Sequence, residues 1–356
     1  MKSKFIFIGG DSRSGGSLLA RLLDHPPQFL SFPLEHEYFA NRNGELFNLT
    51  NFLSERDIKS ILDKEIIQKL LKFADGKLTS KQFYDDDSLF LNKGNFENQL
   101  VKHLKNLGEH ANESDIFEVI ALAFFEAFYN TSLNPLLVTN HCARTFLADL
   151  DRFFQVFDKG YFIHTIREPL SLTASLKHYS YVVTKKHKQL ADSNFVNMAI
   201  ERWILGLWHA LNNKKKYGEK YILISYETLI KNTEEVMKGL CEMLNIPFQE
   251  AFKNPTIGTE LWSGNSSFGA LPQKVSSEGL THYKETLSKE EIDFINEKTG
   301  VQKFDLEKFN FNEGADIYFD EINKITCEFF KNTYAQKITR EYFNFLNDEM
   351  FKIQTG

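Results

Sequence analysis

The sequence predicts an α/β fold of three layers, in which helices flank a central parallel sheet. A Gly-rich turn near the N-terminus joins a short apolar run to an amphipathic helix, further short apolar runs follow, and helical stretches separate them. Runs of this kind are typical of buried parallel strands, because a parallel pair needs a crossover connection that is usually a helix. We therefore expect one sheet built from strands that are distant in the sequence.

The composition is that of a globular protein. The 356 residues are 42% hydrophobic and 25% charged, and the net charge of −6 argues against a general nucleic-acid binder. Three sparse cysteines without a CxxC pair favour a reducing compartment. No apolar run approaches the roughly 18 residues that cross a bilayer, and the N-terminus enters a strand without an apolar signal segment. These features predict a cytoplasmic protein, and they leave open whether it is a monomer or a homodimer.

Three or four strands are expected along the chain, from four candidate runs. The first covers Lys4–Ile8 and leads through the Gly-rich turn into SLLARLLDH, whose leucines recur at helical spacing until Pro26 and Pro27 end the helix. The other three runs are short, apolar and bounded by polar residues. They cover Leu136–Thr139, Tyr161–Ile166 and Tyr221–Ser225.

Two helical additions are expected. Residues 40–130 show no buried strand and contain amphipathic segments such as ERDIKSILDKEIIQKLLKF, which indicates a helical insertion. Residues 310–356 are aromatic-rich and read as a helical C-terminal extension. Neither an internal repeat nor a low-complexity linker interrupts the chain. The simplest organisation is a single domain over residues 1–356 that carries both additions.

The Gly-rich turn is close to a phosphate-binding P-loop. In FIFIGGDSRSGGSLL, residues 5–19, Gly10 and Gly15 occupy the glycine positions of G-x-x-x-x-G-K-[ST], and Gly16 replaces the lysine. Backbone N–H groups and the helix dipole favour an anion at such a turn. Arg13 can clamp a phosphate or sulfate through paired hydrogen bonds, and Ser17 can donate its hydroxyl. The sequence thus predicts an anion site in a P-loop-like fold, with an ordinary strand–helix junction as the alternative.

A second anion site is indicated by FIHTIREPLSLTASLKHYS, residues 162–180. Arg167 follows the expected strand, and Ser175 lies eight residues later in a helix that Pro169 starts. A P-loop NTPase often places a Mg²⁺-binding Asp at the end of such a strand, whereas here the residue is a cation. Arg167 and Ser175 can converge on a second phosphate; the alternative is that Arg167 pairs with Glu168 or another carboxylate.

Two anion sites without metal carboxylates resemble the sulfotransferases that use 3′-phosphoadenosine 5′-phosphosulfate (PAPS). The loop RSGGS is similar to the family's 5′-phosphosulfate loop, [KR]-S-G-T-T, with Arg13 at the basic position, Ser17 at the second Thr and Gly16 in place of the first. LLDHPP is similar to the family's usual end of the first helix. Arg167 and Ser175 match the family's 3′-phosphate pair at the same spacing.

Two further segments carry the resemblance. YILISYETLIKNTEEVMKGLCEMLNIPF, residues 221–248, resembles the family's strand, Y-E-x-L, helix and L-x-I-P-F, which implies that Tyr226 lies near the adenine; Trp203 fits a common tryptophan of the preceding helix. KVSSEGLTHYKETLSKEE, residues 274–291, resembles a divergent form of the C-terminal phosphate-contacting loop. The resemblance implies these cofactor-binding residues: Asp11, Ser12, Arg13, Ser14, Gly15, Gly16, Ser17, Leu18, Arg167, Ser175, Tyr226, Lys274, Ser276 and Gly279.

The resemblance implies metal-independent transfer of a sulfuryl group from PAPS to a hydroxyl or amine, with release of 3′-phosphoadenosine 5′-phosphate (PAP). Arg13 would face the transferring group, and a general base would take the acceptor proton. SFPLEHEYF, residues 31–39, resembles the segment where glycan-type sulfotransferases carry a catalytic Glu, which implies Glu35, in a loop after the first helix. LLVTNHCA resembles the L-L-K-T-H segment of small-molecule sulfotransferases, with His141 as the base, but its register is off by one and Val138 replaces the lysine. Glu35 is the first candidate and His141 the second.

The acceptor is expected to be a small molecule or a glycan, and the insertion is expected to shape its pocket. The basic stretch 177–188 is either a solvated face or an attractor for an anionic acceptor or for the cofactor's phosphates. A metal-dependent P-loop kinase is disfavoured by Gly16 and Arg167. A non-catalytic PAP- or PAPS-binding protein stays open, because Gly16 and Val138 depart from the motifs.

Overall fold

The structure is a computed structural model that describes residues 4–35, 67–68, 93–107, 111–130, 132, 135, 137–141, 150–183, 192–257, 260–262, 264, 266, 268, 275–303, 305–306, 322 and 324–325. The chain divides into two compact units. One consists of Met1–Gly9, Gly16–Phe162 and Met237–Val275, and the other of Gly10–Gly15, Ile163–Val236 and Ser276–Gly356. The expectation of a single domain over the whole chain stays a prediction.

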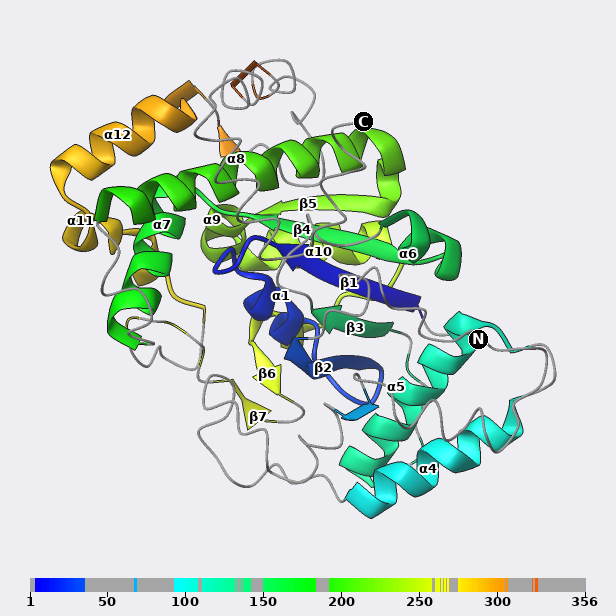
Figure 1. Cartoon of the computed structure of the whole chain (residues 1–356). Helices are drawn as coiled ribbons and strands as arrows, with labels where there is room; N and C mark the ends of the chain where they lie inside the picture. Colours follow the sequence, from blue (N-terminus) through cyan, green and yellow to red (C-terminus); the bar gives the residue numbers. More distant parts are fainter. Residues whose placement is uncertain are drawn as a thin grey trace. The chain divides into compact units, whose positions relative to one another are not determined.

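The α/β fold with a central parallel sheet is confirmed (Figure 1). The sheet has five strands in the order β2-β3-β1-β4-β5. They are β1 (Lys4–Gly10), β2 (Phe29–Glu35), β3 (Leu137–His141), β4 (Tyr161–Ile166) and β5 (Tyr221–Ser225). All four expected strands are present with bounds that differ by at most two residues at either end, and β2 is additional.

The extra strand corrects the expectation that Glu35 lies in a loop, because Glu35 ends β2. β2 pairs with β3 in parallel, and its register shifts between Ser31 and Glu35. Pro33 lies within that shift and has no N–H to donate to a ladder. A strand at the edge of a sheet tolerates such a residue, whereas a central strand does not. Pro33 therefore makes the segment look unlike a strand in the sequence, although the strand still forms at the edge of the sheet.

Phenylalanines form the core of the first unit. Phe5 and Phe7 of β1 stack against Phe117 of α5 (Glu113–Tyr129), with ring centroids 5.6 and 5.8 Å apart. Phe153 of α6 (Leu150–Val156) lies 4.7 Å from Phe7, and Phe157 lies 4.8 Å from Phe5. Edge-to-face and tilted ring pairs of this kind stabilise beyond the apolar area that they bury. Core packing thus accounts for part of the high Phe content.

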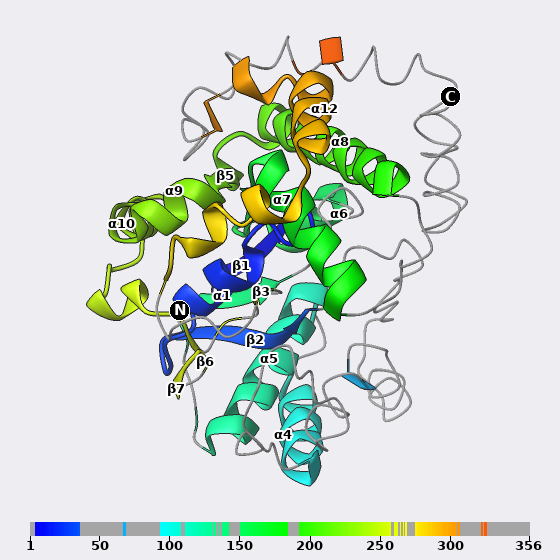
Figure 2. The ribbon, with the colours of Figure 1, turned by 90° about the vertical axis from the view of Figure 1, so that its left-hand side faces the viewer.

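Two helices of the expected insertion are described, α4 (Lys93–Asn106) and α5 (Glu113–Tyr129), and they lie side by side in both views (Figures 1 and 2). A capping box starts α5: the Asn112 side chain accepts from the backbone N–H of Asp115, and the Asp115 carboxylate accepts from the backbone N–H of Asn112. Asn130 ends the helix in the left-handed conformation. Most of residues 40–92 lie outside the described residues.

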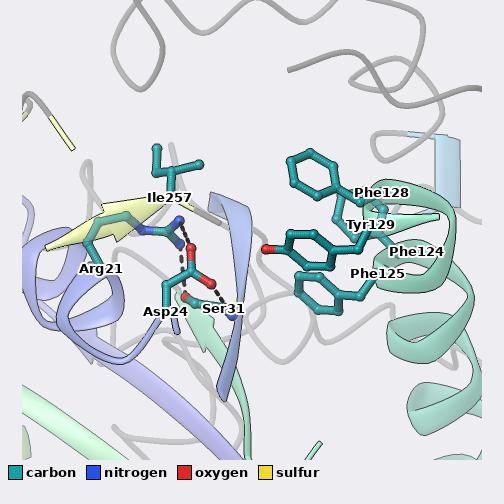
Figure 3. A pocket seen from close by; sticks show the side chains of 8 residues that line it. All are labelled: Arg21, Asp24, Ser31, Phe124, Phe125, Phe128, Tyr129 and Ile257. Atoms are coloured by element: carbon teal, nitrogen blue, oxygen red, sulfur yellow. Dashed lines mark hydrogen bonds and ion pairs between the residues drawn. The ribbon is translucent and has the colours of Figure 1, made fainter. Parts of the chain in front are cut away.

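A buried ion pair fixes the end of α1 (Gly16–Leu22) to β2 (Figure 3). Arg21 donates to the Asp24 carboxylate at 3.1 Å, to Ser31 Oγ at 2.9 Å and to the Phe32 carbonyl at 2.7 Å. The other Asp24 oxygen accepts from the Ser31 backbone N–H at 3.0 Å. A small cavity separates this group from an aromatic wall, formed by Phe124, Phe125, Phe128 and Tyr129 of α5. Both charged groups are paired there, so neither is left as an uncompensated buried charge.

The second unit packs helices beside β4 and β5. They are α7 (Pro169–His178), α8 (Asp192–Tyr217), α9 (Tyr226–Lys231), α11 (Tyr283–Thr286) and α12 (Lys289–Thr299). Pro169 stands in the first turn of α7, as expected, and the Glu168 side chain caps the helix by accepting from the Ser171 N–H at 2.9 Å. A π-helical turn, Tyr179–Val183, follows α7. Lys177 pairs with Glu291 at 2.7 Å and links α7 to α12, which lie together with α8 in Figures 1 and 2.

The remaining described elements are short or peripheral. α10 (Thr233–Leu244) follows α9, and β6 (Thr256–Ile257) pairs with β7 (Glu260–Leu261) in an antiparallel ribbon. Among the helices that the structure describes, we find none with the length and hydropathy that a membrane-crossing segment needs. Only residues 322, 324 and 325 of the expected C-terminal extension are described, so that expectation stays a prediction.

Candidate anion-binding site

The turn after β1 has a shape that glycine makes possible. Gly10 has a φ of +155°, and a Cβ there would lie 2.5 Å from the Thr165 carbonyl oxygen. Gly15 has a φ of +98°, and a Cβ there would lie 2.3 Å from the Tyr226 ring. Between them Arg13 has a φ of +72°, a conformation that is uncommon for a residue with a side chain and that often marks a functional site.

Bonds within the second unit brace this turn. The Ser14 hydroxyl lies 2.6 Å from the Asp11 carbonyl, to which it donates, and 2.9 Å from Thr165 Oγ1 of β4. Asp11 Oδ1 accepts from the Ser12 N–H at 2.7 Å and from the guanidinium of Arg202 on α8. Asp11 and Ser14 are therefore both buried and engaged in holding the turn. Their contact with a cofactor, and that of Ser12, stays a prediction.

Arg13 reaches the second predicted anion site. Its Nε donates to Ser175 Oγ on α7 at 3.2 Å, and its guanidinium carbon lies 5.4 Å from the centre of the Tyr179 ring. Cation–π contact of this kind orients a guanidinium. The structure thus brings together two residues that the sequence assigned to separate phosphates.

Arg167 joins the same cluster. Its two terminal nitrogens donate to the carbonyls of Arg13 at 2.9 Å and Gly279 at 3.2 Å. Its guanidinium carbon lies 4.4 Å from the centre of the Tyr226 ring, and its own carbonyl accepts from Trp203 Nε1 at 2.8 Å. The alternative of an ion pair with Glu168 is not what the structure shows, because the guanidinium bonds to carbonyls.

Two glutamates fix the backbone beside Arg167. Glu227 Oε1 accepts from the backbone N–H of Glu168 at 3.0 Å, and Ser225 Oγ donates to Glu227 Oε2 at 3.3 Å. Burial raises the pKa of both carboxyls, and the Arg167 charge opposes that rise. The Glu of the Y-E-x-L segment therefore positions the turn that carries Arg167.

Sequence reasoning missed Arg202, Glu227 and Tyr179. Arg202 and Asp11 lie 191 positions apart, so no local spacing rule connects them. Glu227 is the Glu of the Y-E-x-L segment and Tyr179 lies in the basic stretch, but the sequence analysis gave neither residue a role in the site. Trp203 was noted, but not its bond to the Arg167 carbonyl.

Three of the predicted cofactor-binding residues and both candidate bases lie in the first unit. Gly16, Ser17 and Leu18 form the first turn of α1. Glu35 and His141 are register partners at the ends of β2 and β3. The two candidate bases therefore come from neighbouring positions of one sheet edge. Ser276 is half-buried, and Lys274 and residues 184–190 lie outside the described residues.

A model of the sulfotransferase family matches residues 6–250, which is more than half of the chain. The chain belongs to the sulfotransferase family. The match covers the Gly-rich turn, both arginines, Ser175 and the Y-E-x-L segment. The resemblance noted in the sequence is thereby confirmed at the level of the family.

Several solved sulfotransferase structures are similar to this sulfotransferase. The sulfotransferase domain of the Synechococcus PCC 7002 olefin synthase is 17% identical over 86% of this chain and 97% of that chain, with a TM-score of 0.45. The sulfotransferase domain of the curacin biosynthetic pathway is 17% identical over 84% and 98%, with a TM-score of 0.46. Sulfotransferase STF9 from Mycobacterium avium is 14% identical over 85% and 77%, with a TM-score of 0.40. The comparison with curated protein sequences gave no match.

Metal ligands form no cluster in the described part of this sulfotransferase. No group of three or more His, Cys, Asp or Glu side chains there could hold a metal ion. Metal independence of the reaction stays a prediction, because much of the chain lies outside that part.

Proposed function

We propose that this sulfotransferase moves a sulfuryl group from PAPS to a hydroxyl or amine of a small-molecule or glycan acceptor and releases PAP without a metal ion. The observation that supports this most strongly is the cluster of Arg13, Ser175 and Arg167. Two guanidinium groups and a hydroxyl gather beside a glycine-shaped turn within one compact unit. Such a cluster suits a cofactor with phosphate at two ends.

Each member has a role in the proposal. The backbone N–H groups of the turn and the Arg13 guanidinium would stabilise charge on the bridging oxygen as the 5′-phosphate leaves. Arg167 and Ser175 would hold the 3′-phosphate. The Arg167 guanidinium donates to two neutral carbonyls, and a phosphate is the stronger acceptor, so the cofactor can take over these donors. Tyr226, stacked on Arg167, is the proposed adenine contact.

The transfer needs a proton acceptor. In the proposed step the acceptor oxygen or nitrogen forms a bond to sulfur, the bond from sulfur to the bridging oxygen breaks, and its electron pair stays on the 5′-phosphate of PAP. The acceptor proton passes to a general base. Glu35 is proposed as that base, with His141 as the second candidate. Glu35 and His141 are register partners at the ends of β2 and β3. Either residue would therefore accept the proton at the same end of these two strands.

The test is transfer of radiolabelled sulfate from PAPS to a panel of phenols, alcohols, sugars and amines. We expect labelled product from at least one class and loss of that product in Arg13→Ala. Arg152→Ala is a matched control, because Arg152 pairs with Glu113 and neither residue belongs to the cluster. PAP binding without transfer to any acceptor would favour a non-catalytic PAP-binding protein. The cytoplasmic location and the absence of a nucleic-acid partner remain predictions from cysteine content and charge.

A further inference from the structure

A small, partly open cavity adjoins the Gly-rich turn, within the second unit. Its lining includes Asp11, Ser14, Thr165, Arg167, Trp203 and Gly206. The cavity thus touches both segments that carry the proposed anion-binding arginines, the turn after β1 and the end of β4. α8 contributes Trp203, Gly206 and Leu207 to the lining.

Two buried polar atoms of lining residues are unpaired. Within the described residues, Asp11 Oδ2 and Arg167 Nε have no hydrogen-bond partner. The side chains' other polar atoms are engaged, because Asp11 Oδ1 bonds to Ser12 and Arg202 and both terminal nitrogens of Arg167 bond to carbonyls. Asp11 is 8% exposed and Arg167 is 7% exposed. Leaving such groups without partners is costly, so each buried unpaired atom of a native protein calls for an explanation.

The opposite polarity of the two atoms limits the occupant. A carboxylate oxygen accepts and a guanidinium N–H donates. An unprotonated anion has no proton to donate to Asp11 Oδ2, and a metal cation cannot accept from Arg167 Nε. A neutral molecule that both donates and accepts satisfies the two together. We propose that this cavity holds one buried water molecule, which accepts from Arg167 Nε and donates to Asp11 Oδ2.

The size of the cavity and its neighbours agree with this occupant. Its volume is about 10 Å³, near the smallest that holds a single water. His164 also lines the cavity and adds no charge at neutral pH, because burial lowers its pKa to about 3. Gly206 of α8 provides the room, since a Cβ built there meets no atom within 4 Å.

The water would connect the turn to the strand end that carries Arg167. With the Asp11–Arg202 pair and the Trp203 bond to the Arg167 carbonyl, it would hold the two anion-binding segments in one arrangement. The effect of the water on cofactor affinity rests on the proposed function. The existence of the water site does not.

The experiment replaces Gly206 in the full chain with alanine or serine and compares thermal unfolding midpoints. Helix propensity alone ranks alanine above serine and both above glycine. In Gly206→Ala the methyl displaces the water without replacing its bonds, whereas in Gly206→Ser the hydroxyl can take its place. We therefore expect the midpoint of Gly206→Ser to exceed that of Gly206→Ala by about 3 °C. Gly239→Ala and Gly239→Ser are matched controls at a half-buried position of α10 outside the cavity, and there alanine should be the more stable.

The same rank order at both positions, with alanine above serine, would overturn the proposal. So would a crystal structure of the chain without water density within hydrogen-bond distance of Asp11 Oδ2 and Arg167 Nε. PAP affinity, measured separately by calorimetry, should fall about tenfold in Gly206→Ala and stay near wild type in Gly206→Ser. If wild type does not bind PAP, the proposed function fails, while the midpoints still decide the water site.

Discussion

Arg13 Nε donates a hydrogen bond to Ser175 Oγ over 3.2 Å, although the two residues lie 162 positions apart in the chain. Arg167 also contacts Arg13, because its guanidinium donates a hydrogen bond to the Arg13 carbonyl. The residues assigned from sequence to the 5′- and 3′-phosphates of a cofactor are therefore in direct contact. The two ends of the proposed site are therefore joined by hydrogen bonds, through the Arg13 side chain to Ser175 and through the Arg13 carbonyl to Arg167.

Arg167→Ala is expected to weaken PAPS binding by roughly 10- to 150-fold, because a charged hydrogen bond contributes about 1.5–3 kcal/mol. The preference for PAPS over adenosine 5′-phosphosulfate, which lacks the 3′-phosphate, should disappear in this variant. Apparent KM values for both donors measure this. A variant that kept the wild-type preference would remove Arg167 from the 3′-phosphate site.

Arg13→Ala is expected to lower kcat as well as affinity, because its guanidinium would face the transferring group. The substitution leaves the Arg13 carbonyl to which Arg167 donates, so the preference for the 3′-phosphate should survive. Steady-state kinetics with PAPS and with adenosine 5′-phosphosulfate separate the two effects. An unchanged kcat with a raised KM would assign Arg13 to binding alone.

Glu35→Gln is expected to lower turnover by roughly 10²–10⁴, the usual contribution of a general base, with little change in PAP affinity. His141→Ala should cost less. Single-turnover rates and PAP calorimetry on both variants decide between the register partners. The reverse order, with Glu35→Gln near wild type and His141→Ala inactive, would give the role to His141.

The stability of the chain is expected to fall as the pH drops below 6.5, in part because of His164. Burial lowers the pKa of His164 to about 3 from an ordinary value of 6.5. Between those pH values the unfolded chain binds a proton that the folded chain does not, so acid favours unfolding. From pH 7 to pH 5 this single group should remove about 2 kcal/mol from the free energy of unfolding.

His164→Gln isolates that contribution, since the amide can still bond the Tyr221 hydroxyl, which lies 2.7 Å from His164 Nδ1. Urea denaturation at the two pH values should show a smaller loss in the variant by about 2 kcal/mol. Equal losses in the variant and the wild type would mean that His164 is charged in the folded protein.

The sequence revealed most of the sheet, and the reason it missed one strand is physical. Tyr161–Ile166 and Tyr221–Ser225 match β4 and β5 residue for residue, because buried parallel strands are uninterrupted apolar runs. β2 escaped because it is an edge strand that contains Pro33 and ends on the charged Glu35. Such a segment lacks the pattern that marks a central strand.

The sequence predicted the site residues that stand in family motifs. It did not predict the residues that join the site only through tertiary contacts. Arg13, Arg167 and Ser175 stand in motifs, and the structure gathers them. The bond from Arg202 to Asp11 and the cavity left by Gly206 depend on how α8 packs against the turn. No periodicity or spacing carries that information.

Calorimetric titration with PAP in excess EDTA tests the central claim most directly. The proposed site predicts one PAP per chain with no loss of affinity on chelation. Adenosine 5′-phosphate, which lacks the 3′-phosphate, should bind at least tenfold more weakly, and Arg167→Ala should abolish that difference. Binding that requires Mg²⁺, or equal affinity of the wild type for the two nucleotides, would contradict the account.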